Sequence, residues 1–269
     1  MQYDPIKKSL GRVFNSTPAL RIFFYRLLDL LLLRSWHIRR EIRQLRTGGF
    51  SPEKIADAGS GFGQYVYYLS KKFPEAKITG LDIKQEQVDD CNTFFGKLNE
   101  GNRISFQYAD LTRISDREVY DLILCVDVME HIEEDRVVLE NYYRALRPGG
   151  VLLISTPSDQ GGSDVHHEHD SSFIDEHVRD GYGQEEMEEK LQSAGFKENH
   201  IRFSYGKPGK RSWKLSMKYP ILMVNASKLF LILLPFYYLL VYPVCYFLNR
   251  SDVRGSHPTG TGLIVMSRK

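Results

Sequence analysis

The sequence predicts an α/β fold built around a mostly parallel sheet. From residue 54 onward, short apolar runs alternate with stretches whose apolar residues recur at helical spacing. This alternation is typical of βαβ units, which place their strands in parallel. Several of the runs are almost entirely apolar, as expected for strands that are covered on both faces. A glycine-rich turn joins the first run to the first helical stretch.

Seven strands and four core helices are expected along the chain. The strands are expected at 54–59, 78–83, 104–110, 120–127, 150–157, 200–206 and 262–269. The helices are expected at 63–73, 84–100, 134–150 and 184–196. The segment Arg147–Gly150 ends the third helix, because proline and glycine do not continue a helix.

The 269 residues suggest one large domain that carries an insertion, at about 150 residues per domain. We divide the chain into four parts, which are a basic and apolar helical segment, the core, an apolar helical insertion, and the last strand of the core. Their bounds are 1–50, 51–206, 207–261 and 262–269.

Composition excludes several classes of protein. With 42% hydrophobic and 26% charged residues, the chain is neither disordered, collagen-like nor a polytopic membrane protein. Its three cysteines form no CxxC pair, which argues against a disulfide scaffold and fits a reducing compartment. The first residues lack the pattern of a secretory signal. A cytoplasmic location is therefore expected.

Charge is distributed unevenly along the chain. Residues 1–50 hold ten Lys/Arg against three Asp/Glu, residues 51–196 hold 14 against 29, and residues 197–269 hold 12 against two. The two basic ends also contain the longest apolar runs. Basic charge beside an apolar helix favours contact with anionic lipid. The alternative is that both runs pack on the core and the basic residues form a solvated rim.

The run 229–248 has 20 residues without a charge, which is long enough to span a membrane. Pro235 and Pro243 argue against a straight helix. A single crossing would also separate the last strand from the rest of its sheet. We therefore expect short helices that lie on the inner face of a membrane or fold over a pocket as an apolar lid, with residues 18–36 as their neighbour.

The glycine-rich turn holds Gly59, Gly61 and Gly63 in the pattern GxGxG. Glycine permits a tight turn and a close approach of the backbone to a ligand, and the following helix N-terminus supplies N–H donors. Asp57, two residues before the first glycine, would repel a pyrophosphate and attract a cationic ligand.

Two more acids follow neighbouring strands. Asp82 ends the second strand, where a carboxylate can accept both hydroxyls of a ribose. Asp110 ends the third, where it can receive an adenine amino group, with Leu111 beside the ring. Because open α/β sheets bind ligands at the carboxyl ends of their strands, these acids and Asp57 define one crevice.

With these residues, the chain resembles the class I S-adenosylmethionine-dependent methyltransferases. DAGSGFG, LDI and YADL resemble their first three motifs, and YDLILCVDVMEHI resembles the fourth in the form seen in ubiquinone-type O-methyltransferases. LRPGGVLLISTP resembles the motif that leads into strand five. The resemblance covers about residues 52–206 and resumes at 262–269. It implies a Rossmann-like, seven-stranded sheet whose last strand is antiparallel and lies between strands five and six.

The resemblance also implies a cofactor, S-adenosyl-L-methionine, and roles for individual residues. Asp57, Gly59 and Gly61 would hold its methionine end, Asp82 its ribose and Asp110 its adenine, and the backbone near Val126 would bind its amino group. The expected cofactor-binding residues are Asp57, Gly59, Gly61, Gly63, Asp82, Ile83, Asp110, Leu111 and Val126. The expected acceptor is a lipophilic or amphipathic small molecule, methylated on oxygen.

Three other functions compete with this reading. A nicotinamide-dependent dehydrogenase would need glycine at position 64 for GxGxxG, but Gln64 stands there. A nucleic-acid methyltransferase fits the basic ends, but the apolar runs suit bases poorly and no NPPY-like motif follows the fourth strand. A membrane-docked binding or scaffold protein would keep the fold without catalysis, and cofactor binding without turnover would identify it.

Two clusters are candidates for a role in the reaction. His131 follows the fourth strand and is the expected catalytic base, with capping of the next helix as the alternative. Glu130 beside it has no clear third partner for a metal ion. Residues 164–170 hold three histidines and three acids and are read as a solvated loop or a pocket lining, and we expect no metal site. His177, Arg179 and Tyr182 are further candidates for acceptor contacts.

Overall fold

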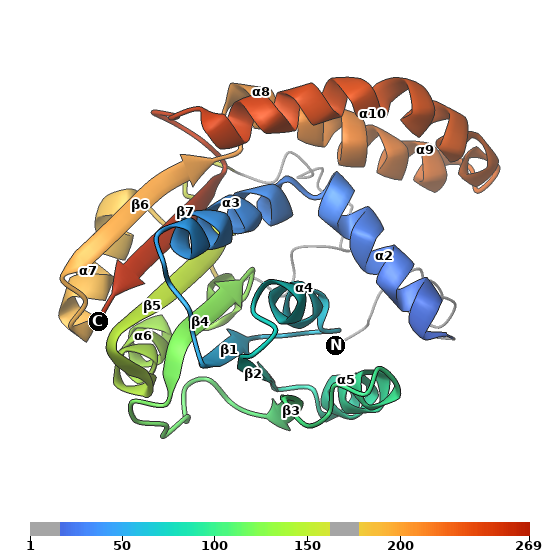
Figure 1. The fold of residues 1–269 in the computed structure, drawn as a ribbon. Coiled ribbons are helices and arrows are strands. Elements are labelled where there is room, and N and C mark those ends of the chain that lie inside the picture. Colours follow the sequence, from blue (N-terminus) through green and yellow to red (C-terminus); the bar gives the residue numbers. More distant parts are fainter. Residues whose placement is uncertain (1–16, 162–177) are drawn as a thin grey trace.

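The computed structural model describes residues 17–161 and 178–269, and a seven-stranded sheet forms its centre (Figure 1). The strands are β1 (Lys54–Ala58), β2 (Lys77–Asp82), β3 (Ile104–Tyr108), β4 (Tyr120–Val126), β5 (Leu146–Pro157), β6 (Glu198–Ser204) and β7 (Gly262–Arg268). Their order in the sheet is β3-β2-β1-β4-β5-β7-β6. The first five strands run parallel, and β7 pairs antiparallel with both β5 and β6. The predicted sheet and the place of its last strand are confirmed.

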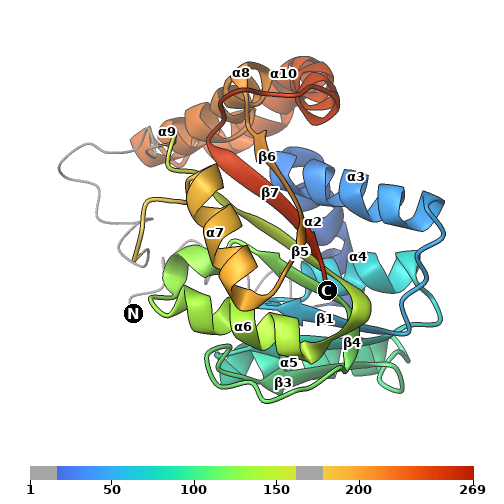
Figure 2. The same ribbon diagram turned by 90° about the vertical axis from the view of Figure 1, so that its left-hand side faces the viewer.

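Helices cover both faces of the sheet (Figure 2). Three lie on one face, namely α3 (Leu33–Thr47), α4 (Gln64–Lys72) and α5 (Gln85–Lys97). Two lie on the other, namely α6 (Asp135–Ala145) and α7 (Gln184–Ala194). Successive strand residues point to opposite faces, so Ile55 packs with the first group and Ala56 with the second.

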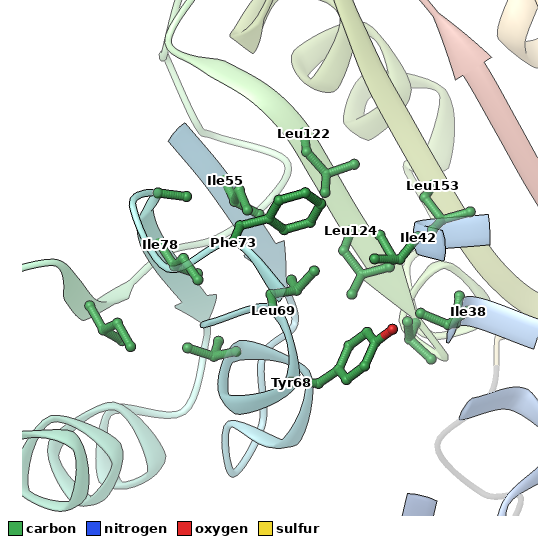
Figure 3. Packing of buried hydrophobic residues seen from close by; sticks show 14 of the residues in the cluster. Ile38, Ile42, Ile55, Tyr68, Leu69, Phe73, Ile78, Leu122, Leu124 and Leu153 are labelled. Carbon is green, nitrogen blue, oxygen red and sulfur yellow. The ribbon is translucent and has the colours of Figure 1, made fainter. Parts of the chain in front are cut away.

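The N-terminal helix α3 is part of the core. Its Ile38 and Ile42 are fully buried and lie close to Leu124 of β4 and Leu153 of β5 (Figure 3). These residues stand four apart, so they share one face of the helix. The basic N-terminal segment therefore covers the sheet as well as carrying positive charge.

A further helix, α2 (Pro18–Leu31), precedes α3 and is separated from it by Leu32, whose backbone is extended. Thr17 caps α2, since its side chain accepts a hydrogen bond from the Leu20 N–H at 3.3 Å, and Pro18 occupies the first turn. One side of α2 is buried on the core, and the other exposes Leu20, Phe23 and Leu30.

The insertion between β6 and β7 forms a helical hairpin, residues 207–254. Its outgoing limb comprises α8 (Lys207–Trp213), a π-helical turn (Lys214–Lys218) and α9 (Tyr219–Ala226), and its returning limb is α10 (Phe230–Arg254). The helical character of the insertion is confirmed, but the expectation that it contains only short helices is wrong. α10 runs unbroken through Pro235 and Pro243. Each proline removes one backbone donor but leaves the remaining turns of this apolar helix intact.

A buried polar network fixes the root of the helical hairpin to the core. Asp252, near the end of α10, is fully buried and lies 2.9 Å from the Nε2 of His37 on α3. It also accepts hydrogen bonds from the backbone N–H groups of Tyr205 and Gly209, at 3.1 and 2.9 Å. Three segments that are distant in sequence thus meet at one carboxylate.

Candidate functional site

The glycine-rich turn lies between β1 and α4, and all three of its glycines have positive φ angles. A side chain at Gly59 is excluded on two grounds, because its φ is +75° and a Cβ there would lie 2.2 Å from the Val128 side chain. The turn therefore brings backbone close to the residues that follow β4. A turn of this kind can present backbone N–H groups at the N-terminus of the following helix to a ligand.

Asp57 and Asp82 are brought together beneath this turn. The Gly61 N–H donates a hydrogen bond to Asp82 Oδ2 at 2.7 Å, and the Lys84 N–H donates to Oδ1 at 2.9 Å. Asp57 is buried, and its Oδ2 atom has no hydrogen-bond partner within the described residues. Burial and the nearby Asp82 charge raise the pKa of Asp57 to about 7.

This arrangement fits a cationic ligand. A buried carboxylate oxygen without a partner is costly unless a donor or a positive charge reaches it. A second carboxylate beside it strengthens the negative potential. The sulfonium of S-adenosylmethionine would supply the missing positive charge next to Asp57, and the oxygens of Asp82 face the same turn.

The other expected cofactor-binding residues lie at or just beyond the ends of β2, β3 and β4. Asp110 lies two residues beyond β3, and its Oδ1 atom accepts hydrogen bonds from the backbone and side chain of Thr112. These bonds lower the pKa of the Asp110 carboxyl. Leu111 and Val126 are buried, whereas Ile83 is exposed just after β2. All four follow or end strands at the carboxyl edge of the sheet.

The segment after β4 carries three ionisable residues. Asp127 has a positive φ of 52°, and Glu130 is buried within a short 3-10 turn, Met129–His131. The Thr156 hydroxyl donates a hydrogen bond to Glu130 Oε2 at 3.1 Å. Burial and the Asp127 charge raise the pKa of Glu130 to about 8. The side chain of His131, the expected base, is exposed on the same turn.

Four residues that the sequence did not single out meet beside this segment. Arg34 of α3 forms an ion pair with Asp127, and its backbone N–H donates to the hydroxyl of Tyr205 at 3.1 Å. The hydroxyl of Tyr65, on α4, also contacts the Arg34 guanidinium. We call these the arginine cluster: Arg34, Tyr65, Asp127 and Tyr205. Since they come from four distant segments, no local motif could reveal them.

The residues suggested as acceptor contacts differ in where they lie. Residues 164–170 and His177 lie outside the described residues. Tyr182 is fully buried, and its hydroxyl lies 2.9 Å from Asp135 Oδ2 and 3.0 Å from the Met129 carbonyl. The expectation that Tyr182 contacts the acceptor is therefore wrong, because its hydroxyl is buried and hydrogen-bonded at the start of α6. Arg179 joins the same carboxylate at 2.6 Å.

Among residues 17–161 and 178–269, no group of three or more His, Cys, Asp or Glu side chains is placed to hold a metal ion. Glu130 and His131, adjacent in sequence, differ in exposure: the first is buried and the second exposed.

Comparison with known proteins agrees with this geometry. Residues 55–150 match a family model described as a methyltransferase domain. A malonyl-[acyl-carrier protein] O-methyltransferase from Priestia megaterium is 32% identical over 116 residues, which are 43% of this chain and 41% of that protein. A ubiquinone biosynthesis O-methyltransferase from Idiomarina loihiensis is 26% identical over 114 residues, 41% of this chain and 44% of the other. The chain thus spans about two fifths of the length of the curated relatives it matches.

Solved structures share the fold. Phosphoethanolamine N-methyltransferase 2 of Haemonchus contortus, in complex with S-adenosyl-L-methionine, superposes with a TM-score of 0.58 and 15% identity over 81% of this chain and 49% of that one. A SAM-dependent methyltransferase from Aquifex aeolicus superposes with a TM-score of 0.51 and 18% identity over 75% of this chain and 93% of the other.

Proposed function

Because residues 55–150 form a class I S-adenosylmethionine-dependent methyltransferase domain, we propose that the whole chain transfers a methyl group to a lipophilic or amphipathic small molecule at a membrane surface. The acceptor atom is an oxygen. The observation that carries the proposal is the buried, unpartnered Oδ2 of Asp57 beside Asp82 and the glycine-rich turn.

S-adenosylmethionine, when bound, supplies a methyl group on a positively charged sulfur. In this chain Asp57 holds a negative charge toward that end of the cofactor, and Asp82 accepts the ribose hydroxyls. Gly59 lets the turn pack closely against Val128, where a Cβ would clash. Asp110 and Leu111 bind the adenine, and the backbone near Val126 receives the amino group.

Removal of a proton from the acceptor hydroxyl is assigned to His131. An imidazole nitrogen can accept a proton as a general base, and an exposed side chain can pass that proton on to solvent. His131 lies on the turn after β4, at the same edge of the sheet as Asp57. Glu130, whose pKa is raised to about 8, lies behind it and supports the turn from inside.

The helical hairpin supports an acceptor of apolar character. α10 is long and apolar enough to cross a membrane by length and composition, with a mean hydropathy of 2.0 over its most apolar window and 6% of that window buried. Both ends of the helical hairpin are fixed to the sheet, however, because Ser204 of β6 pairs with Gly262 of β7 at the root. The chain leaves and re-enters the sheet at one point, so α10 alone cannot cross a bilayer while both strands stay paired.

Apolar and basic residues along the helical hairpin favour contact of its apolar side with a membrane. The exposed apolar side chains gather from α9 onward and along α10: Ile221, Leu222, Leu229, Leu231, Ile232, Leu233, Phe236, Leu239 and Leu240. The outgoing limb nearer the root is basic: Lys207, Lys210, Arg211, Lys214 and Lys218. Lys228 lies in the turn between α9 and α10, and the apolar side chains of both helices extend from there toward this basic collar. Apolar helices beside basic residues suit the acyl region and the anionic head groups of a cytoplasmic leaflet.

Calorimetry with S-adenosylmethionine tests the proposal at the cofactor. We expect micromolar affinity, about −8 kcal/mol. Asp82→Ala should weaken binding by about 1.5–3 kcal/mol, the range for hydrogen bonds to a charged group. Asp89→Ala, at an exposed position on α5, is the matched control and should leave the affinity unchanged. Absence of binding by the unmodified chain would refute the proposed function.

The acceptor is accessible to mass spectrometry. Lipid extracts from cells with and without the gene are compared for a pair of species that differ by about 14 Da, the mass of one added CH2 unit. Cofactor binding without any such pair, and without turnover on the extracts, would instead identify a membrane-docked binding protein.

A further inference from the structure

We propose that the arginine cluster is the head-group subsite of the acceptor pocket, in which Arg34 binds an oxyanion, a carboxylate or a phosphate monoester, on an acceptor with an apolar tail. This inference rests on the proposed function, and it names the chemical class of the acceptor. Its evidence comes from the unused donors of Arg34, from backbone strain, and from the position of the cluster between the crevice and the helical hairpin.

Arg34 has more donors than the protein uses. Its Nη1 pairs with Asp127, the guanidinium also donates to the Tyr65 hydroxyl, and its buried Nε–H has no hydrogen-bond partner within the described residues. Its side chain is 35% exposed, and that of Asp127 is 32% exposed. A guanidinium carries five N–H donors in a planar fork that matches the two oxygens of a carboxylate or phosphate. The ion pair with Asp127 thus leaves donors for a ligand.

Two contacts of Arg34 are made by residues in a strained backbone conformation. Asp127 has φ +52°, and Tyr205 has φ +54°. Positive φ is uncommon for any residue except glycine and is an outlier for a bulky side chain such as tyrosine. Such strain persists where the surrounding structure enforces it, and it gathers at ligand sites. A partly exposed ion pair contributes little to stability, so it does not by itself account for two strained neighbours.

The cluster lies where an amphipathic acceptor would place its polar end. Asp127 follows β4 directly, at the carboxyl edge of the sheet and next to the turn that carries His131. Tyr205 follows β6 directly and precedes the helical hairpin. Two residues beyond Arg34, Trp36 contacts Tyr246 of α10, with ring centroids 5.3 Å apart. An acceptor bound by Arg34 can therefore extend its tail toward the apolar helical hairpin.

Both tyrosines are suited to donate to the same oxyanion. The Tyr65 hydroxyl lies 3.2 Å from the Ser35 hydroxyl, and burial raises its pKa to about 12. Burial also raises the pKa of Tyr205. Both phenols therefore stay protonated at neutral pH and remain hydrogen-bond donors. Since both hydroxyls contact Arg34, an oxyanion bound by Arg34 would have phenol donors beside it.

The test compares three probes that share one tail. Dodecanoate, dodecyl phosphate and dodecanol are titrated below their aggregation limits into the full chain saturated with S-adenosylhomocysteine, and binding is followed by calorimetry. We expect both anions, or one of them, to bind at least about tenfold more tightly than dodecanol. Preference for one anion identifies the head group as carboxylate or phosphate. Equal affinity for all three probes would overturn the proposal.

Variants then assign the preference to Arg34. Arg34→Gln should weaken anion binding about tenfold and leave dodecanol within twofold, while Arg43→Gln, on the exposed side of the same helix, should change neither. Asp127→Asn should strengthen anion binding, because it removes the competing carboxylate. If the ion pair between Arg34 and Asp127 had only a structural role, replacing either residue should weaken anion binding to the same extent. Equal losses in Arg34→Gln and Asp127→Asn, or equal losses for all probes, would contradict the subsite.

Two further readouts distinguish a folding defect, and a failure of the proposed function, from a failure of the subsite. If Arg34→Gln does not fold, as judged by thermal unfolding, then Arg34→Lys is used, which keeps the charge but not the planar fork. It should lose part of the anion preference. S-adenosylhomocysteine binding is measured on every sample. Its absence would refute the proposed function, whereas its presence without any head-group preference would refute only the subsite.

Discussion

Arg21 of α2 donates a hydrogen bond to the carbonyl oxygen of Phe62, 2.7 Å away, and Phe62 lies between two glycines of the turn beneath which Asp57 and Asp82 meet. The Tyr25 hydroxyl donates to the same oxygen at 2.5 Å. Arg21 is almost completely buried and also pairs with Asp90 on α5 at 2.6 Å. A helix that precedes the sheet by more than 20 residues therefore holds the glycine-rich turn in place.

This clamp predicts an effect on cofactor affinity from a residue that does not touch the cofactor. Tyr25→Phe removes one hydrogen bond to the Phe62 carbonyl, and it should weaken S-adenosylmethionine binding by about 1 kcal/mol, or about fivefold. Calorimetry measures the change. Tyr143→Phe, on the opposite face of the sheet, serves as the control. Unchanged affinity in Tyr25→Phe would mean that the turn holds its shape without α2.

Cofactor binding should depend on pH through Asp57. Because its pKa is about 7, the carboxylate that we propose faces the sulfonium is mostly protonated at pH 6 and mostly ionised at pH 8. S-adenosylmethionine affinity should therefore rise roughly tenfold from pH 6 to pH 8. S-adenosylhomocysteine carries no sulfonium and should vary much less. Asp57→Asn should flatten the dependence, and a profile that stays steep in that variant would assign it to another group.

Asp57 should also make the folding stability of the protein without cofactor depend on pH. Its pKa in the folded state, about 7, lies above the ordinary value of 3.8, so the folded state binds the proton more tightly than the unfolded state. Folding stability should consequently fall as the pH rises from about 4 to 7. Asp57→Asn avoids burying a charge and should unfold at higher urea than the unmodified chain at pH 8, with little difference at pH 4. A destabilised variant at pH 8 would contradict the assignment.

His131 is predicted to control turnover without affecting cofactor affinity. His131→Ala should lower the rate of S-adenosylhomocysteine release on a methylatable lipid extract by about 10²–10⁴. His200→Ala, on β6, is the matched control. Calorimetry with S-adenosylmethionine should give the unmodified affinity for both variants. Normal turnover in His131→Ala would leave the residue with a capping role only.

Asp252 is predicted to hold the root of the helical hairpin. Asp252→Asn replaces a buried charge with an amide whose N–H faces other donors, so it should lower the free energy of unfolding by about 3 kcal/mol. Urea denaturation measures this, with the exposed Asp89→Asn as the control. A loss below about 1 kcal/mol would show that packing alone fixes the root.

Membrane contact is predicted to depend on the exposed apolar side chains of α10. The double change Ile232→Glu and Leu240→Glu places charge on exposed apolar positions, so it should abolish co-sedimentation with vesicles that contain phosphatidylserine. S-adenosylmethionine affinity should stay the same. Binding by the unmodified chain should weaken with salt, since the basic collar contributes about 1 kcal/mol per charge near the surface.

Two controls complete the membrane experiment. Vesicles of phosphatidylcholine alone should bind the unmodified chain less well. A C-terminal tag should remain accessible to protease, because β7 must stay beside β5 and β6. Protection of the tag on the far side of the vesicle would contradict both the topology and the proposed contact. Full solubility without any lipid binding would leave the helical hairpin as a lid over the acceptor.

Local sequence determined the sheet and the first part of the site. The alternation of apolar runs with helical spacing, together with the glycine-rich turn, is a short-range signal, because strand burial and turn conformation act on neighbouring residues. Asp57, Asp82 and the three glycines follow from it, since parallel strands present their carboxyl ends at one edge. The same reasoning places His131 at that edge.

Only the tertiary structure decided the remainder. Arg34 meets Asp127 across 93 residues, and His37 meets Asp252 across 215, and neither pair leaves a pattern in the sequence. The prolines of α10 also misled the local reading, because a helix interrupted at two donors still gains from packing against α8. The sequence also suggests an acceptor contact for Tyr182, but the fold buries this residue, and its hydroxyl donates to Asp135. Local preferences fix elements, whereas long-range packing and charge pairing choose which side chains meet.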